Sequence, residues 1–157
     1  MDCCASSNNR ETAKTGRCPS CGENGKGLSI ITLKSLLIAS SLETIEPDNT
    51  YFFCPNSSCN TVYFSGTHLQ TFKEDALKVP VFQKNSSMHV PVCYCFNWTR
   101  DRLFQAYSDN LQPIEHIKEH VQSNRCGCEV NNPQGACCLG NVTAYLRSLN
   151  ERKVEEI

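Results

Sequence analysis

Residues 51–64 read YFFCPNSSCNTVYF, so two cysteines stand between two short runs of aromatic and β-branched residues. Such runs favour β-strands, and we expect Tyr51–Phe53 and Val62–Phe64 to pair as a hairpin. Cys54 and Cys59 would then lie together at its tip. The stretch therefore predicts a small, ribbon-like β unit that presents thiols to a metal ion.

A second closely spaced pair, Cys18 and Cys21, lies upstream of this hairpin. Two such pairs can converge on one tetrahedral ion. The predicted ligands of a Zn²⁺ ion are therefore Cys18, Cys21, Cys54 and Cys59. A closed shell of four ligands leaves no position for water, so we expect this ion to be structural. Two alternatives stay open: a site that uses Cys3 and the carboxylate of Asp48, and a cysteine-rich loop without metal.

The second half of the chain holds a further group of cysteines, which are Cys93, Cys95, Cys126, Cys128, Cys137 and Cys138. We interpret this group as the source of ligands for an iron–sulfur cluster. The two groups together indicate a small redox metalloprotein, in which one ion acts as a staple and the other cofactor exchanges one electron. The alternative is that these cysteines are free thiols, because free cysteine often behaves as a small buried hydrophobe.

The chain has 157 residues, 12 cysteines and a net charge of −1. Two small lobes that each rely on a cofactor for stability fit this composition. The amino terminus lacks a basic start followed by an apolar stretch, and no run is long enough to span a bilayer. We therefore expect a cytoplasmic, reducing setting without membrane insertion. Scattered charges argue against a non-specific hold on nucleic acid.

The sequence divides into four parts. Residues 1–16 are polar and are predicted to form a flexible arm that carries cysteines. Residues 17–87 are predicted to form the zinc-binding lobe and a linker, and residues 88–150 a helical lobe. Residues 151–157 mix charges of both signs and are predicted to be a polar tail that frays from the last helix. The predicted fold class is therefore α+β, with a zinc-ribbon-like β lobe followed by a three-helix lobe.

Within the first lobe, glycines at residues 22–27 predict a turn-rich segment, and Leu28–Ile31 has the composition of a strand. A short helix capped by Thr32 is expected next. Its apolar face would carry Leu33, Leu36 and Leu37. Residues 79–82 are expected to form a last strand before the linker.

Three helices are predicted in the second lobe. Thr99 is a suitable N-cap for the first, with an apolar stripe at Leu103, Phe104 and Tyr107. Pro113 is expected at the first position of the second helix, and the third helix is expected to begin near Cys138. Helix amino termini carry partial positive charge, which stabilises an anionic, thiolate-ligated cluster.

The second predicted helix contains the string His116-Ile117-Lys118-Glu119-His120, which matches the H-x-x-E-H pattern of one class of metalloprotease. No third ligand is evident in the sequence, and the helix is accounted for by the packing of Ile114, Ile117 and Val121. We therefore expect no protease site here.

The second lobe resembles the [2Fe-2S] fold of bacterioferritin-associated ferredoxin, through the string VCYCFNWT at residues 92–99, the three helices and the cysteine before the last helix. With CPSC at residues 18–21, the aromatic hairpin, and CEVNNPQGACC at residues 128–138, the chain more closely resembles the amino-terminal zinc and [2Fe-2S] domain of CopZ-type copper chaperones. The resemblance covers residues 17–149.

The resemblance implies a ligand set for the cluster, which is Cys93, Cys95, Cys128 and Cys138. Cys138 matches the ferredoxin cysteine at the head of the last helix, and the block at residues 128–138 makes Cys128 its partner. Cys126 and Cys137 remain rival ligands. Residues 132–135, Asn-Pro-Gln-Gly, would form a tight turn that brings the chain back to the iron.

The function implied by the resemblance is that of a metallochaperone that transfers one electron and reduces Cu(II) to Cu(I) before delivery. It implies an electron carrier rather than a turnover enzyme. The implied partners are copper or other soft-metal ions, a separate copper-carrier protein or P-type ATPase, and a reductase. Full-length chaperones carry a copper-binding domain with a C-x-x-C loop that this sequence does not contain. We therefore expect a separate carrier, a soft-metal port for Cu⁺ at Cys3 and Cys4, or a role as electron donor alone.

Two other classes of function remain open. The first is a non-redox protein whose thiols sequester Cu(I), Hg(II) or Zn(II), and it predicts a colourless protein. The second is an interaction or nucleic-acid module built on the zinc ribbon, which would require a salt-dependent association.

Overall fold

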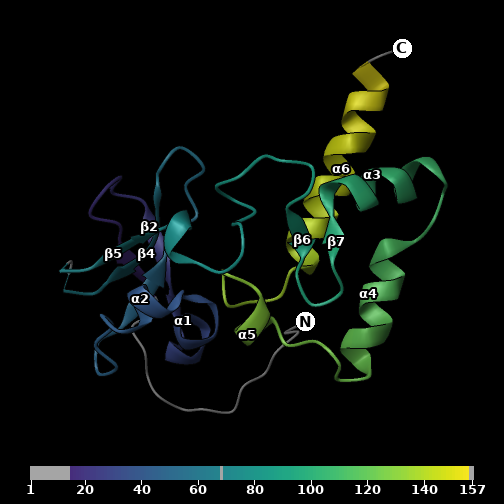
Figure 1. The fold of residues 1–157 in the computed structure, drawn as a ribbon. Helices are drawn as coiled ribbons and strands as arrows, with labels where there is room; N and C mark the ends of the chain where they lie inside the picture. Colours follow the sequence, from purple (N-terminus) through teal and green to yellow (C-terminus); the bar gives the residue numbers. More distant parts are fainter. Residues whose placement is uncertain (1–14, 68, 156–157) are drawn as a thin grey trace.

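The computed structural model describes residues 15–67 and 69–155. These residues form a sheet lobe, residues 15–87, and a helical lobe, residues 88–155, which lie side by side (Figure 1). Most of the predicted flexible arm lies outside the described residues. Its last two residues belong to a strand, so the sheet lobe begins at Thr15.

The sheet lobe contains five antiparallel strands whose spatial order follows the sequence. These strands are β1 (Thr15–Arg17), β2 (Asn24–Leu28), β3 (Tyr51–Phe53), β4 (Thr61–Ser65) and β5 (Thr71–Lys73). The predicted hairpin is β3 and β4, which pair Phe52 with Phe64. The sheet is wider than a hairpin because the glycine-rich residues expected to form a turn are largely strand β2.

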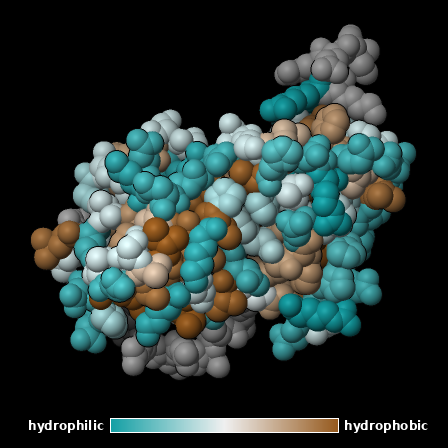
Figure 2. Space-filling model, in the orientation of Figure 1, coloured by the Kyte–Doolittle hydropathy of each residue, from teal (hydrophilic) through white to brown (hydrophobic). Residues whose placement is uncertain are grey.

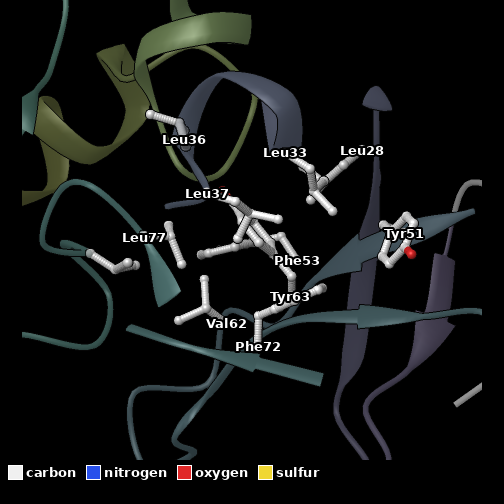
Figure 3. Packing of buried hydrophobic residues seen from close by; sticks show 11 residues of the cluster. Leu28, Leu33, Leu36, Leu37, Tyr51, Phe53, Val62, Tyr63, Phe72 and Leu77 are labelled. Atoms are coloured by element: carbon white, nitrogen blue, oxygen red, sulfur yellow. The ribbon is translucent and has the colours of Figure 1, made fainter. Parts of the chain in front are cut away.

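Helices α1 (Ile30–Leu36) and α2 (Ala39–Leu42) follow β2, and the 3₁₀ turn η1 (Glu74–Ala76) follows β5. The apolar side of α1 packs on the sheet, where Leu33 and Leu37 meet Phe53 and Tyr63 (Figure 3). The predicted apolar face of α1 is therefore confirmed. The predicted cap is wrong, because Ser29 occupies the N-cap position and Thr32 lies inside the helix.

Residues 79–82 do not form the predicted strand. Val81 is nevertheless fully buried in the sheet-lobe core, and its backbone N–H donates to Glu74 Oε2 at 2.8 Å. This side-chain partner replaces a strand partner for that backbone group. On the other side of the linker, Arg100 donates to the carbonyl oxygens of Phe82 and Asn85 at 2.8 and 2.6 Å. The linker is thus bonded to both lobes.

The helical lobe starts with a two-stranded sheet, β6 (Pro91–Cys93) and β7 (Trp98–Thr99). Its helices are α3 (Arg100–Ser108), α4 (Pro113–Gln122), α5 (Cys128–Asn131) and α6 (Leu139–Glu155). The three predicted helices are α3, α4 and α6, whereas the four-residue α5 was not predicted. Helix α6 continues to Glu155, so most of the predicted polar tail is helical.

The predicted helix starts are confirmed. Thr99 Oγ1 accepts a hydrogen bond from the Arg102 backbone N–H at 3.1 Å, and Pro113 is the first residue of α4. The predicted stripe on α3 is partly wrong, because Phe104 is 47% exposed and Ala106 is buried instead. A separate core holds the helical lobe together and includes Val92, Leu103 and Val142.

The surface accords with the balanced charge of the chain. Hydrophilic residues are spread over both lobes on the face that Figure 2 shows, with hydrophobic residues between them. None of the helices within residues 15–67 and 69–155 is both long enough and apolar enough to cross a bilayer.

Candidate metal centres

The first thiol group comprises Cys18, Cys21, Cys54 and Cys59, whose sulfur atoms all lie within 4.8 Å of one another. The Cys18 and Cys59 sulfurs are 3.9 Å apart, and those of Cys21 and Cys54 are 3.6 Å apart. A tetrahedral Zn²⁺ ion with Zn–S bonds of about 2.3 Å requires sulfurs separated by about 3.8 Å. The arrangement therefore fits a closed four-thiolate site for Zn²⁺ or another soft ion.

Two short loops bring these thiols together. In the first loop, the Cys18 N–H donates to Glu23 O at 2.9 Å and the Gly22 N–H donates to Cys18 O at 2.8 Å. Gly22 has a φ of +77°, a conformation that favours glycine. In the second loop, Cys54 follows β3 and Cys59 precedes β4, with Asn56 Oδ1 accepting from the Ser58 N–H at 3.0 Å. The sulfurs converge because both loops sit at one end of neighbouring strands.

The four thiols differ in their surroundings. Cys18, Cys54 and Cys59 are buried beside the stacked rings of Phe52 and Phe64, whereas Cys21 is exposed. The backbone N–H at Glu23 lowers the pKa of Cys21 to about 7. Burial raises the pKa of Cys54 to about 12. Cys21 is therefore the corner of this group at which solvent reaches a thiolate.

Lys84 from the linker reaches this group. Its Nζ donates to Cys54 Sγ at 3.5 Å and to Asn56 O at 2.5 Å. The ammonium lowers the pKa of Cys54, in opposition to the effect of burial. A tetrathiolate site with a divalent ion carries net negative charge, and a half-buried cation beside it offsets part of that charge.

The second thiol group comprises Cys93, Cys95, Cys128 and Cys138. Three of these thiols are buried and Cys95 is half-buried. The Cys95 and Cys128 sulfurs are 3.7 Å apart, Cys128 interacts with Cys138, and Cys138 interacts with Cys93. Within the part of the chain that the structure describes, only the first thiol group brings three or more ligand atoms all within 4.8 Å of one another. The second group is therefore an extended string of thiols rather than a compact tetrahedron.

The string is drawn from three segments of the helical lobe. Cys93 ends β6 and Cys95 lies in the following turn, Cys128 begins α5, and Cys138 immediately precedes α6. The Gly127 N–H donates to Cys95 Sγ at 3.1 Å, and Asn131 Nδ2 lies 3.6 Å from the same sulfur. Hydrogen bonds of this kind stabilise a thiolate and tune the potential of a metal bound to it.

The thiols of the second group alter one another's pKa. The neighbouring Cys128 thiol raises the pKa of both Cys95 and Cys138, and burial adds to the effect. The Cys138 thiol lowers the pKa of Cys93. Crowded thiols cannot all ionise without positive charge among them, and a bound metal supplies that charge.

Comparison with known proteins bears first on the sheet lobe. Residues 15–78 match the family of CopZ-type zinc-binding domains. Across 122 residues the chain is 29% identical to the copper chaperone CopZ of Archaeoglobus fulgidus, covering 78% of this chain and 57% of that protein. The X-ray structure of the N-terminal domain of A. fulgidus CopZ has a TM-score of 0.67 and 28% identity, covering 82% of this chain and 95% of that chain. The chain resembles the CopZ N-terminal domain in both sequence and fold.

The match has defined limits along the chain. The CopZ-type zinc-binding family model ends before the linker and does not include the second thiol group. The chain spans about 57% of the length of the CopZ protein. The family match and the convergent thiols support a site for Zn²⁺ or another soft metal in the sheet lobe.

The alternative ligands named from the sequence lie elsewhere. Asp48 is exposed in the turn before β3 and does not belong to the first thiol group. Cys3 and Cys4 lie outside the described residues. Cys126 is half-buried two residues before Cys128, and Cys137 is half-buried beside Cys138, so both stay next to the second group without a test of either as a ligand.

The two histidines of α4 serve as an anchor for the loop that carries Cys95. His116 and His120 have their Nε2 atoms 3.1 Å apart, and Trp98 Nε1 donates to His116 Nδ1 at 3.2 Å. Phe96 stacks on His120, with the ring centres 4.7 Å apart. No third His, Cys, Asp or Glu among residues 15–67 and 69–155 completes a metal site with this pair. The described residues thus provide no protease-type triad.

The sequence missed the polar contacts that connect the two lobes. Lys84 stood in a segment interpreted as a plain linker. Tyr63 was assigned only to a strand, yet its hydroxyl donates to Pro133 O at 2.6 Å. Thr32 was assigned as a cap, yet its Oγ1 donates to Glu129 O at 2.7 Å. These partners are 70 and 97 residues away in the chain, and no local pattern identifies them.

Proposed function

We propose that this chain is an iron–sulfur and zinc-containing, metallochaperone-like protein whose one-electron transfer serves copper handling. In the proposed reaction, Cu(II) takes up one electron and becomes Cu(I), and a reductase supplies that electron. A [2Fe-2S] cluster bound to the second thiol group would supply the one-electron acceptor and donor. The first thiol group would hold Zn²⁺ and stabilise the sheet lobe.

The observation that carries this proposal is the contrast in shape between the two thiol groups. A single tetrahedral ion needs four mutually close sulfurs, as in the first group. A [2Fe-2S] cluster takes two thiolates on each iron, and an extended string of four thiols suits that arrangement. The assigned ligands are Cys18, Cys21, Cys54 and Cys59 for zinc, and Cys93, Cys95, Cys128 and Cys138 for the cluster.

The protein residues around the second group favour bound, anionic sulfur. Cys93 and Cys128 are fully or almost fully buried, which keeps water from the thiolates. The Gly127 N–H and the Asn131 side chain point toward Cys95 Sγ and would stabilise its negative charge. Cys138 lies at the amino end of α6, where the helix dipole favours an anion.

The link to copper is supported by the likeness to a protein named as a copper chaperone. The proposed setting is the cytoplasm, with a separate copper carrier or P-type ATPase as the receiver of Cu(I). The competing function is thiol-based sequestration of Cu(I), Hg(II) or Zn(II) without electron transfer. The exposed Cys21 favours that alternative, because it offers a thiolate to soft ions at the surface.

Metal analysis of anaerobically purified protein separates these functions. We expect one zinc, two irons and two acid-labile sulfides per chain, together with a paramagnetic signal after reduction by dithionite. Anaerobic addition of Cu(II) to the reduced protein should then produce Cu(I), measured with a Cu(I)-specific chelator, in a 1:1 ratio to reduced cluster. A colourless protein without acid-labile sulfide would contradict the proposal and favour sequestration.

A further inference from the structure

The segment from Cys128 to Cys138, here named the docked segment, joins two of the thiols in the second group. It consists of α5, the turn at residues 132–135 and the residues before α6. Helix α5 packs against α1 of the sheet lobe, and the two helices lie next to each other in Figure 1. The docked segment therefore belongs to the helical lobe by sequence and lies against the sheet lobe in space.

Three residues of the sheet lobe and linker hold the docked segment by hydrogen bonds. Thr32 Oγ1 donates to Glu129 O at 2.7 Å, and Tyr63 OH donates to Pro133 O at 2.6 Å. Gln83 Nε2 donates to Gln134 Oε1 at 2.6 Å. Two of the three acceptors are backbone carbonyls, so these bonds fix the course of the chain itself.

Steric fit places the docked segment in the same position. Gly135 has a φ of +67°, and a Cβ added there would lie 2.8 Å from Leu28 Cδ2 and 3.1 Å from Thr32 Oγ1. Any side chain at this position would push the turn away from the sheet lobe. The turn is also braced internally, because Asn132 Nδ2 donates to Ala136 O at 2.9 Å. A displacement at the turn would consequently reach Cys138.

The three hydrogen bonds differ in their exposure to water. Gln83 and Gln134 line an open cavity of about 600 Å³ between the lobes, so water can replace the bond between them. Tyr63 is fully buried, and Pro133 is buried as well. Removal of the Tyr63 hydroxyl would leave the carbonyl of Pro133 without its buried donor, which is the more damaging loss.

Tyr63 also stands close in sequence to the first thiol group. It lies on β4, four residues after Cys59, and its ring packs in the sheet-lobe core beside Phe53. We propose that Tyr63 is a positioning residue through which the sheet lobe sets the placement of Cys128 and Cys138. This inference rests on the proposed function insofar as those two thiols hold the cluster.

The test replaces Tyr63 by phenylalanine, with Tyr51→Phe as the matched control. Tyr51 is as deeply buried, but its hydroxyl accepts from the Glu46 N–H and donates to Gln70 Oε1, both within the sheet lobe. Each variant loses one buried hydroxyl from the same sheet. Only Tyr63→Phe detaches the docked segment.

Two readouts follow in the zinc-loaded full chain. In the iron-loaded protein, Tyr63→Phe should release iron to a chelator about tenfold faster than the wild type and change the visible circular dichroism of the cluster, with zinc content unchanged. In protein prepared without iron, amide hydrogen exchange within residues 128–138 should rise by a similar factor. Tyr51→Phe should match the wild type in both measurements at this segment.

Thr32→Val provides a second variant, because it removes a hydroxyl without changing the shape of the side chain. It should act in the same direction as Tyr63→Phe. Equal exchange and equal iron release in Tyr63→Phe and Tyr51→Phe would overturn the inference. A wild type without acid-labile sulfide, but with the exchange difference intact, would overturn the proposed function instead and leave Tyr63 as a positioning residue of a thiol site.

Discussion

The two thiol groups are built in different ways. The first uses two short loops at one end of the five-stranded sheet, and every sulfur belongs to the same lobe. The second uses three segments, one of which is held in place by residues of the other lobe. The difference teaches that the sheet lobe can form its site alone, whereas the second group depends on the sheet lobe. The dependence therefore runs in one direction.

The largest expected effect comes from removal of one thiol in each group. Cys54→Ser should abolish zinc binding and unfold the sheet lobe, because a structural zinc site contributes about 10–16 kcal/mol to folding. Iron should then be lost too, since the docked segment would have no support. Cys138→Ser should lose iron and keep zinc. Metal analysis and circular dichroism of both variants check this asymmetry, and retention of iron by Cys54→Ser would show that the lobes are independent.

A smaller effect is expected from Gly135→Ala. An alanine at positive φ costs about 1–2 kcal/mol, and its Cβ would also collide with Leu28. Iron should leave at least tenfold faster, with zinc retained. Gly22→Ala is the matched control, because Gly22 has a φ of +77° and no atom within 4 Å of the added Cβ. Rates of chelator-driven metal loss provide the measurement, and identical iron loss in both variants would remove steric fit as the cause.

The smallest effect distinguishes thiols within the first group. In metal-free protein the lowered pKa of Cys21, about 7, means that its thiolate prevails above that pH. Its alkylation by iodoacetamide should therefore fall as pH drops through 7, by about tenfold for each pH unit below. Cys54, whose pKa is raised to about 12, should react far more slowly at every pH tested. Peptide mapping from pH 6 to 9 measures both, and equal labelling would contradict the assigned exposure.

Sequence spacing was sufficient where ligands and supporting strands are close together in the chain. The hairpin of β3 and β4, the N-cap at Thr99 and the start of α4 at Pro113 all follow from local chemistry. The first group of four thiols also came together as the spacing predicted, although no measurement assigns them as ligands. These features depend on residues fewer than about 50 positions apart.

The features that the sequence did not predict have partners far away in the chain. Helix α5 has only four residues and no capping side chain, and its place is set by α1 of the other lobe. The glycine-rich residues before Leu28 form a strand because β1 and β3 lie on both sides of them. Tertiary pairing here overrides the low strand propensity of glycine.

The strand order of the sheet lobe carries a consequence for biosynthesis. Because each strand pairs with its immediate successor, the sheet requires only local contacts and can fold rapidly while the polypeptide is still emerging from the ribosome. Residues 15–84 are all available before Cys128 has been translated. We therefore expect the nascent chain to mature in order, with a finished platform waiting for the stretch that later settles on it.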